Sequence, residues 1–203
     1  MRFAVFATKS AGIATLNELR SRSFLRTFRE APAYIRDMAL LELPHTAGCV
    51  VCGKDNPHGL GLNLKVDPQS GVISVKYLSQ PKHIGFVDII HGGIQGLILD
   101  EAMVWAATWS GKRFCVCGEM VVRYRRSVPV GHQLHIEASV SAVRSRLIET
   151  QSSIRDAEGT LYTTATGKYV PLPIEQSEKF ANSVLIEPGT SEALHALRRG
   201  FGS

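Results

Sequence analysis

The segment at residues 91–107, HGGIQGLILDEAMVWAA, combines a mostly apolar sequence with groups that could do chemistry. A histidine and two glycines open it, and two adjacent acids, Asp100 and Glu101, interrupt its apolar run. Burying a carboxylate without partners costs several kcal/mol. We therefore expect at least one of the two acids to serve as a general base or a nucleophile. The alternative is that both are structural, paired with backbone N–H groups or with arginine.

The same residues predict a long buried helix over residues 91–109, because apolar side chains occur on all of its faces and Ser110-Gly111 would end it. Adjacent residues lie about 100° apart around a helix, so Asp100 and Glu101 cannot share one face. We expect one acid to face the sheet or an edge, and the other to face a cleft or a second subunit.

The start of this helix, His91-Gly92-Gly93, predicts a site for negative charge. Free N–H groups and the helix dipole make a helix N-terminus electropositive, and glycine lets a ligand approach the backbone, so a thioester oxyanion could bind there. Glycines that simply begin a helix are the alternative. His91 and Asp100 are nine residues apart, or about 13 Å along the axis. Asp100 could therefore reach only a carbonyl held by a second, antiparallel helix, as in a two-fold dimer.

The elements that must position these residues alternate in a way that predicts an α+β fold. Alternating apolar residues and turn signals predict two strands before the helix and four after it, with an irregular link at residues 80–90. Short connections favour an antiparallel sheet, and a helix buried on all sides must be wrapped by it. The predicted strands are residues 62–66, 72–78, 114–127, 133–143, 147–155 and 161–170, the last four as a meander.

Three parts are predicted along the chain: an N-terminal helical extension (1–44), the sheet-and-helix domain (45–173) and a polar C-terminal tail (174–203). We expect an amphipathic helix near residues 11–41 and one short helix at residues 192–199. The extension is rich in arginine and poor in acids, so an organelle transit peptide is the alternative to a cytoplasmic protein.

Composition excludes several classes of protein. The chain has 203 residues, 44% of them hydrophobic, and a net charge of +5. It has no apolar run of about 18 residues, so we expect no membrane span. Basic and aromatic residues do not cluster as in a nucleic-acid-binding face, so no nucleic-acid partner is expected. A mildly basic protein suits an anionic small molecule.

The four cysteines raise the question of a metal site. Cys49-x-x-Cys52 with Cys115-x-Cys117 could form a four-thiolate zinc site, but the second pair has one intervening residue where such sites have two to four. Buried apolar cysteines and a loop thiol pair are the alternative that we favour. We therefore expect no metal and no cofactor.

Three motifs in order resemble a known family. The helix motif H-G-G-x6-D, the upstream CVVCGKDNPHGLGL and the downstream GEMVVRYRRSVPVG resemble the hot-dog-fold acyl-CoA thioesterases of the phenylacetic-acid-degradation (PaaI) type, over residues 48–171. The resemblance implies an antiparallel β-sheet wrapped around one long central helix. It also implies an acyl-CoA substrate, no cofactor, and a homodimer or a dimer of dimers (a homotetramer).

The resemblance assigns roles to individual residues of the helix. Asp100 matches the catalytic acid, and the Gly92 amide matches the oxyanion donor, with His91 beside it as the third catalytic residue. Gly93 and Glu101 are expected to contact substrate, and Glu101 is the second candidate acid.

Two positions depart from the family pattern. The serine or threonine that stands seven residues before the strand tyrosine, Tyr124, is Cys117 here, which we retain as a substrate-binding residue. The asparagine that one subgroup has six residues before the histidine is Gly85 here. The function that the resemblance implies is hydrolysis of an acyl-CoA thioester. The alternative is a non-catalytic hot-dog protein that binds acyl-CoA or serves as an assembly scaffold.

Four basic residues are candidates for binding the CoA phosphates: Arg123, Arg125, Arg126 and Lys168.

Overall fold

The computed structural model describes residues 40–201, and the helix expected near residues 11–41 therefore lies almost wholly outside the described residues. The residues at the expected end of that helix are described, and they are not helical: Leu41–Glu42 forms strand β1, which pairs with β2 at Leu64–Val66. These residues belong to the sheet, although the sequence placed them in a helical extension.

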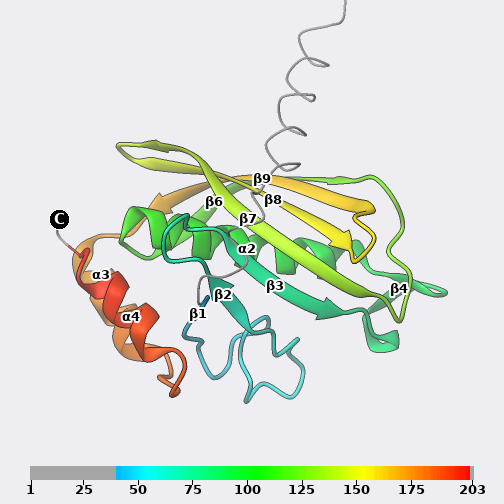
Figure 1. The fold of residues 1–203 in the computed structure, drawn as a ribbon, viewed down its shortest axis with the longest axis horizontal. Coiled ribbons are helices and arrows are strands. Elements are labelled where there is room, and N and C mark those ends of the chain that lie inside the picture. Colours follow the sequence, from blue (N-terminus) through cyan, green and yellow to red (C-terminus); the bar gives the residue numbers. More distant parts are fainter. Residues whose placement is uncertain (1–39, 202–203) are drawn as a thin grey trace, which may run out of the picture. The chain divides into compact units, whose positions relative to one another are not determined.

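The central element is helix α2, Gly92–Gly111, which contacts five strands of the main sheet and is overlaid by it in Figure 1. Its buried residues cover most of its circumference. One face is not fully buried, because Gly93, Leu97, Asp100 and Val104 lie along it and are exposed or half-buried, so the burial on all sides that the sequence predicted is only partly met. The His91 ring caps the first turn, because its Nδ1 accepts a hydrogen bond of 2.8 Å from the Gly93 N–H. At the other end Lys112, and not a glycine, takes the left-handed conformation that ends the helix, with φ of 48°.

The main sheet has seven antiparallel strands in the order β1-β2-β3-β7-β8-β9-β6. An antiparallel sheet around one long helix is therefore confirmed. The four strands after the helix do not form the predicted meander, because β6 pairs with β9 and not with β7, which places β6 at the sheet edge. The strands that contact α2 are β3 (Ile73–Leu78), β6 (Cys115–Tyr124), β7 (Gln133–Arg144), β8 (Leu147–Asp156) and β9 (Leu161–Pro171).

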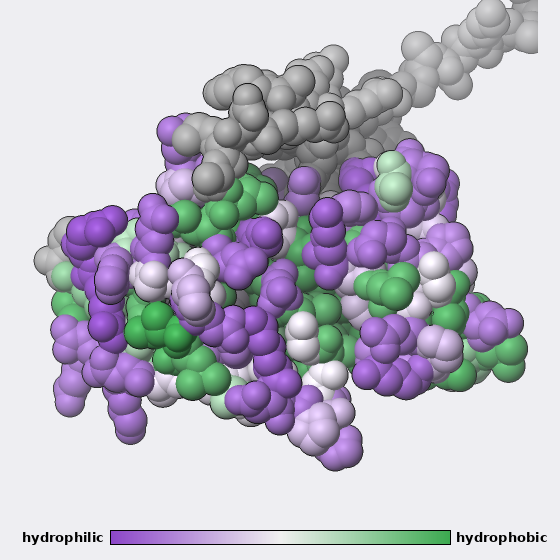
Figure 2. Space-filling model, turned by 60° about the horizontal axis from the view of Figure 1, so that its bottom comes forward, coloured by the Kyte–Doolittle hydropathy of each residue, from purple (hydrophilic) through white to green (hydrophobic). Residues whose placement is uncertain are grey.

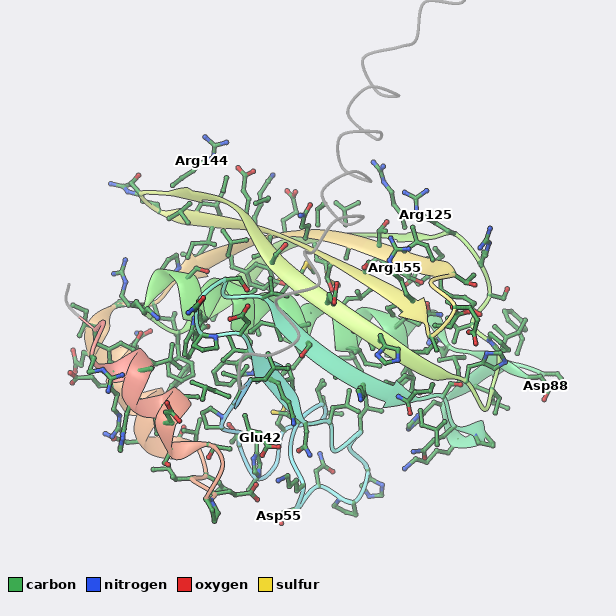
Figure 3. The ribbon with its side chains drawn as sticks, in the orientation of Figure 1. Glu42, Asp55, Asp88, Arg125, Arg144 and Arg155 are labelled. Atoms are coloured by element: carbon green, nitrogen blue, oxygen red, sulfur yellow. The ribbon has the colours of Figure 1, made fainter. Side chains whose placement is uncertain are left out.

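The link before the helix, predicted to be irregular, contains a small hairpin. A 3-10 turn at Pro81–His83 leads into β4 (Ile84–Phe86), which pairs with β5 (Ile89–Ile90). Asp88, labelled in Figure 3, makes the tight turn between them with φ of 58°. The hairpin delivers the chain directly to the start of α2.

The C-terminal tail holds two helices where the sequence predicted one. The predicted helix is α4, Ser191–Arg198, and the other is α3, Ile174–Ser183. Only Ser177 and Ala181 of α3 are buried, so its short apolar stripe gave little signal in the sequence. Ala181 packs with Leu194 of α4 in a small second core.

Hydrophobic residues also reach the surface. On the face shown in Figure 2 they form separate patches among hydrophilic residues. Across residues 40–201, no helix is long and apolar enough to cross a membrane.

Candidate active site

Asp100 lies half-buried on α2 and is held by a tyrosine from the sheet. The Tyr169 hydroxyl, on β9, donates a hydrogen bond of 2.7 Å to the Asp100 Oδ1. Tyr169 is fully buried, and this burial, followed by the nearby Asp100 carboxylate, raises the pKa of its phenol. The phenol therefore remains a hydrogen-bond donor at neutral pH. Gly167 makes room for the ring, because a Cβ there would lie 2.5 Å from Tyr169 Cε2.

Cys117 joins this pair from the edge strand. It lies opposite Tyr169 in the β6–β9 register, and its thiol interacts with the Asp100 carboxylate. Burial raises the pKa of the Cys117 thiol, and the Asp100 charge raises it further. The thiol is therefore neutral and takes the place of the hydroxyl that the family pattern has at this position.

The start of α2 presents one open backbone donor. His91 engages the Gly93 N–H, whereas the Gly92 N–H has no hydrogen-bond acceptor among residues 40–201. The Tyr124 hydroxyl, on β6, donates a hydrogen bond of 2.9 Å to the Gly92 carbonyl and fixes this peptide. A Cβ at Gly92 would lie 3.1 Å from the Tyr124 ring, so this close approach favours glycine.

This donor borders a cavity of about 540 Å³. The cavity is lined by the helix start, by the β4–β5 hairpin and by two arginines, Arg125 and Arg126, of the segment after β6. Figure 3 shows Arg125 at this end of the sheet. Of the other basic candidates for the CoA phosphates, Lys168 is instead paired with Glu119 at 2.9 Å.

Position 85, where one subgroup of the family has an asparagine, has no room for a side chain in this fold. A Cβ at Gly85 would lie 2.9 Å from the His91 ring and 3.1 Å from His91 Cα. The glycine therefore allows the hairpin to pack against the residue that caps α2.

Asp100 does not line the cavity at Gly92. Gly92 and Asp100 are eight positions apart on α2, which is about 12 Å along the axis. Within one chain, the acid and the open backbone donor are therefore apart, as the spacing predicted.

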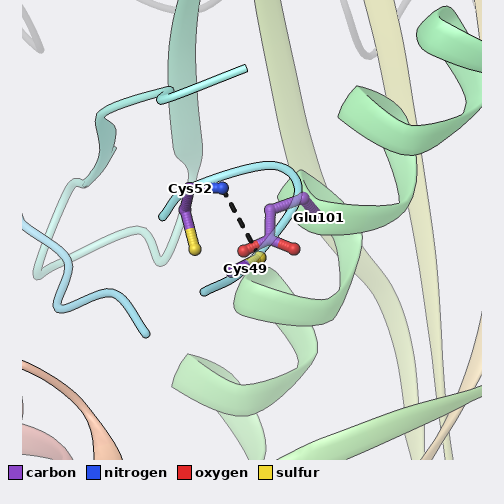
Figure 4. Close-up of side chains that lie close together, drawn as sticks. All are labelled: Cys49, Cys52 and Glu101. Carbon is purple, nitrogen blue, oxygen red and sulfur yellow. Dashed lines mark hydrogen bonds between the residues drawn. The ribbon is translucent and has the colours of Figure 1, made fainter. Parts of the chain in front are cut away.

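Glu101 faces a different part of the molecule. It accepts a hydrogen bond of 3.2 Å from Trp105 Nε1, and it lines a second cavity together with Cys49 and Cys52. Figure 4 shows its carboxylate close to these two cysteines. Burial raises the pKa of the Glu101 carboxyl group. The two acids thus lie in separate surroundings, as the helical spacing predicts. The resemblance implied that Glu101 contacts substrate. The contact of Tyr169 with Asp100 was not predicted, because its only signal in the sequence was a tyrosine on an inward-facing strand position.

Comparisons with known proteins bear on the fold. Residues 88–163 match the family model for the thioesterase superfamily. A solved structure described as a thioesterase superfamily protein is 23% identical, with a TM-score of 0.58, over 80% of this chain and 81% of its own. The domain has the hot-dog fold. A comparison with curated protein sequences gives no match.

Two further hot-dog structures carry the PaaI name. The Escherichia coli PaaI protein is 18% identical, with a TM-score of 0.52, over 56% of this chain and 80% of its own. The phenylacetic acid degradation protein PaaI of Thermus thermophilus is 23% identical, with a TM-score of 0.51, over 56% of this chain and 95% of its own. These structures confirm the hot-dog fold that the resemblance implied, and residues 88–163 are similar to the thioesterase superfamily.

Proposed function

We propose that this hot-dog domain hydrolyses acyl-CoA thioesters to free acid and CoA. One observation carries the proposal: the Asp100 carboxylate, on the central helix, is oriented by the hydroxyl of the buried Tyr169 beside the edge strand β6. A carboxylate fixed in this way can remove a proton from water or attack the thioester carbonyl itself.

The oxyanion would form at the start of α2. The Gly92 N–H is unengaged by residues 40–201, borders the cavity and lies at the positive end of the helix dipole. Arg125 and Arg126 line the same cavity and would place positive charge near the CoA phosphates.

Because the acid and the oxyanion donor are about 12 Å apart on one helix, we infer that each site takes one from each of two chains. The edge strand β6 supports this inference. It is ten residues long, and among residues 40–201 it is hydrogen-bonded to another strand only on the side that faces β9. A long free edge that also exposes Val116, Val121 and Tyr124 favours pairing with another strand. Antiparallel pairing of two β6 strands about a two-fold axis would bring two α2 helices together in opposite directions.

The alternative function is acyl-CoA binding without hydrolysis. Cys117 favours it, because a thiol is a weaker hydrogen-bond donor than the hydroxyl usual at this position. The two functions share the cavity and differ in whether Asp100 performs a reaction.

A thiol-release assay with a panel of acyl-CoAs separates them. We expect the wild-type chain to release CoA, Asp100→Asn to lower turnover by about 100-fold or more, and Glu101→Gln to cost much less. Circular dichroism verifies that both variants fold. If the wild-type chain binds acyl-CoA but releases no thiol from any member of the panel, the binding function is correct and the hydrolytic one is wrong.

A further inference from the structure

A second cluster of reactive side chains lies on the side of α2 away from the cavity at Gly92. Cys49, Cys52 and Glu101 each contribute one sulfur or carboxylate oxygen, and these three atoms lie within 4.8 Å of one another. Figure 4 shows the two thiols of the loop and the Glu101 carboxylate from the helix converging on one another. The proposed hydrolysis uses none of these three groups.

We propose that Cys49, Cys52 and Glu101 bind a zinc ion that ties the loop before β2 to the central helix. Thiolates together with a carboxylate suit tetrahedral zinc, whose ligand bonds are about 2.3 Å for sulfur and about 2.0–2.2 Å for oxygen. In a tetrahedral site two sulfurs are about 3.8 Å apart. The cluster would therefore need to contract by only about 1 Å or less.

The loop geometry favours Cys49 as a metal-bound thiolate. The backbone N–H groups of Val51 and Cys52 point at the Cys49 Sγ, at 3.4 and 3.5 Å. Two such donors stabilise negative charge on the sulfur. Gly53 closes the turn with a hydrogen bond of 3.0 Å from its N–H to the Cys49 carbonyl. A Cβ at Gly53 would lie 2.4 Å from the Ala47 carbonyl oxygen, so the turn requires glycine.

The ligands are also held in place from both sides. Two backbone hydrogen bonds, from Leu60 to Val50 at 2.8 Å and from Leu62 to Val51 at 2.9 Å, fix the loop against the chain that enters β2. On the helix, Trp105 Nε1 orients the Glu101 carboxylate. Binding would therefore order few additional groups, which favours affinity.

The donor set differs from the four-thiolate site considered from the sequence. Cys117 lies beside Asp100, away from this cluster, and the third ligand is the helix carboxylate. All three ligands line a cavity of about 360 Å³, which leaves room for water or an added ligand at a fourth position.

Cobalt(II) titration of the reduced, chelator-treated full-length chain tests this proposal. We expect one cobalt per chain, with the charge-transfer absorption of thiolate-bound cobalt, and displacement of that cobalt by zinc. Cys49→Ser and Cys52→Ser should each abolish this absorption, and Glu101→Gln should weaken binding about tenfold or more. Matched controls are Cys117→Ser and Asp100→Asn, which change another cysteine and the neighbouring acid and should leave cobalt binding unchanged.

The wild-type titration decides the proposal even where a variant fails to fold. Absence of the thiolate-to-cobalt absorption from the folded wild-type chain would overturn it. So would unchanged affinity in a folded Glu101→Gln variant, or an equal loss in Cys117→Ser. Thiol counting provides an independent measurement: zinc should protect two thiols per chain, whereas a disulfide between Cys49 and Cys52 that forms despite excess zinc would also overturn the proposal.

Discussion

Replacing Tyr169 with phenylalanine removes one hydroxyl and leaves the packing of its ring in place. That hydroxyl donates a hydrogen bond of 2.7 Å to the Asp100 carboxylate, and the tyrosine is fully buried. A hydrogen bond to a charged group contributes about 1.5–3 kcal/mol to the free energy of unfolding. For a domain of this size, the loss corresponds to a decrease in Tm of roughly 3–12 °C.

The same substitution should lower thioester hydrolysis. Tyr169 is a positioning residue, because it holds the Asp100 carboxylate and does not border the cavity at Gly92. A misplacement of about 1 Å in a reacting group can cost about 100-fold in rate. We expect kcat in the thiol-release assay to fall by about 10- to 100-fold, with KM changing little.

Tyr162→Phe is a matched control on the same strand. The Tyr162 hydroxyl donates to Asp156 Oδ2 at 3.0 Å, at the β8–β9 turn and away from α2. Because Asp156 is close to solvent, losing this hydrogen bond should cost less stability than losing the Tyr169–Asp100 bond, and kcat should be unchanged. Adding Tyr169→Phe to Asp100→Asn should lower kcat little beyond Asp100→Asn alone. If Tyr169→Phe keeps wild-type kcat, the hydroxyl does not position the acid and the reasoning is refuted.

Three further predictions concern other parts of the fold. Gly96→Ala should raise the free energy of unfolding by about 0.5–1 kcal/mol, because the new Cβ would meet no atom closer than 4.0 Å. Gly111→Ala should leave the free energy of unfolding unchanged or lower it by up to about 2 kcal/mol, because its Cβ would lie 2.5 Å from Ile148; urea unfolding compares the two variants. Burial, with a smaller effect of Lys82, lowers the pKa of His83, so folding favours its neutral form. This stabilisation is present above the unfolded pKa of about 6.5 and is lost as pH falls. Urea unfolding at about pH 7 and about pH 5.5 should therefore show a larger loss of stability on acidification in the wild type than in His83→Gln, and equal losses would contradict this. Cys117→Ser should keep or raise thioesterase kcat, because a hydroxyl is the stronger donor, and a fall as large as that of Asp100→Asn would show that the thiol itself is required.

The sequence predicted the elements whose physical signals are local. Alternating apolar residues predicted strands at residues 72–78 and 133–143, where β3 and β7 lie, because side chains on a strand alternate between its faces. The histidine and glycines at residues 91–93 located the start of α2, where His91 caps the helix. The spacing of Asp100 and Glu101 correctly predicted that the two acids lie in different surroundings.

Pairings between distant segments could not be predicted in the same way. The contact of Tyr169 with Asp100 depends on where β9 lies over α2, and neither residue is unusual for its own element. The placement of β6 at the sheet edge depends on the connection after it, because β6 pairs with the last strand and not with the next one. The approach of Cys49 and Cys52 to Glu101 likewise depends on how a loop folds back onto the helix.

A site shared between two chains can be tested by complementation in mixed dimers. One chain carries Asp100→Asn, and the other carries Gly92→Pro, which removes the open N–H at a helix position where proline is tolerated. A Cβ at position 92 also crowds the Tyr124 ring, so Gly92→Ala is the matched control that keeps the N–H. Two different affinity tags allow heterodimers to be isolated.

The most direct measurement of the central claim is the thiol-release rate of these purified heterodimers. Each parent homodimer should be nearly inactive, because both of its sites carry a lesion. In the heterodimer, one site carries both lesions and the other carries none, so up to half of the wild-type activity per dimer should return. If purified heterodimers remain as inactive as their parents, Asp100 and Gly92 do not act across two chains, and the proposed mechanism is wrong.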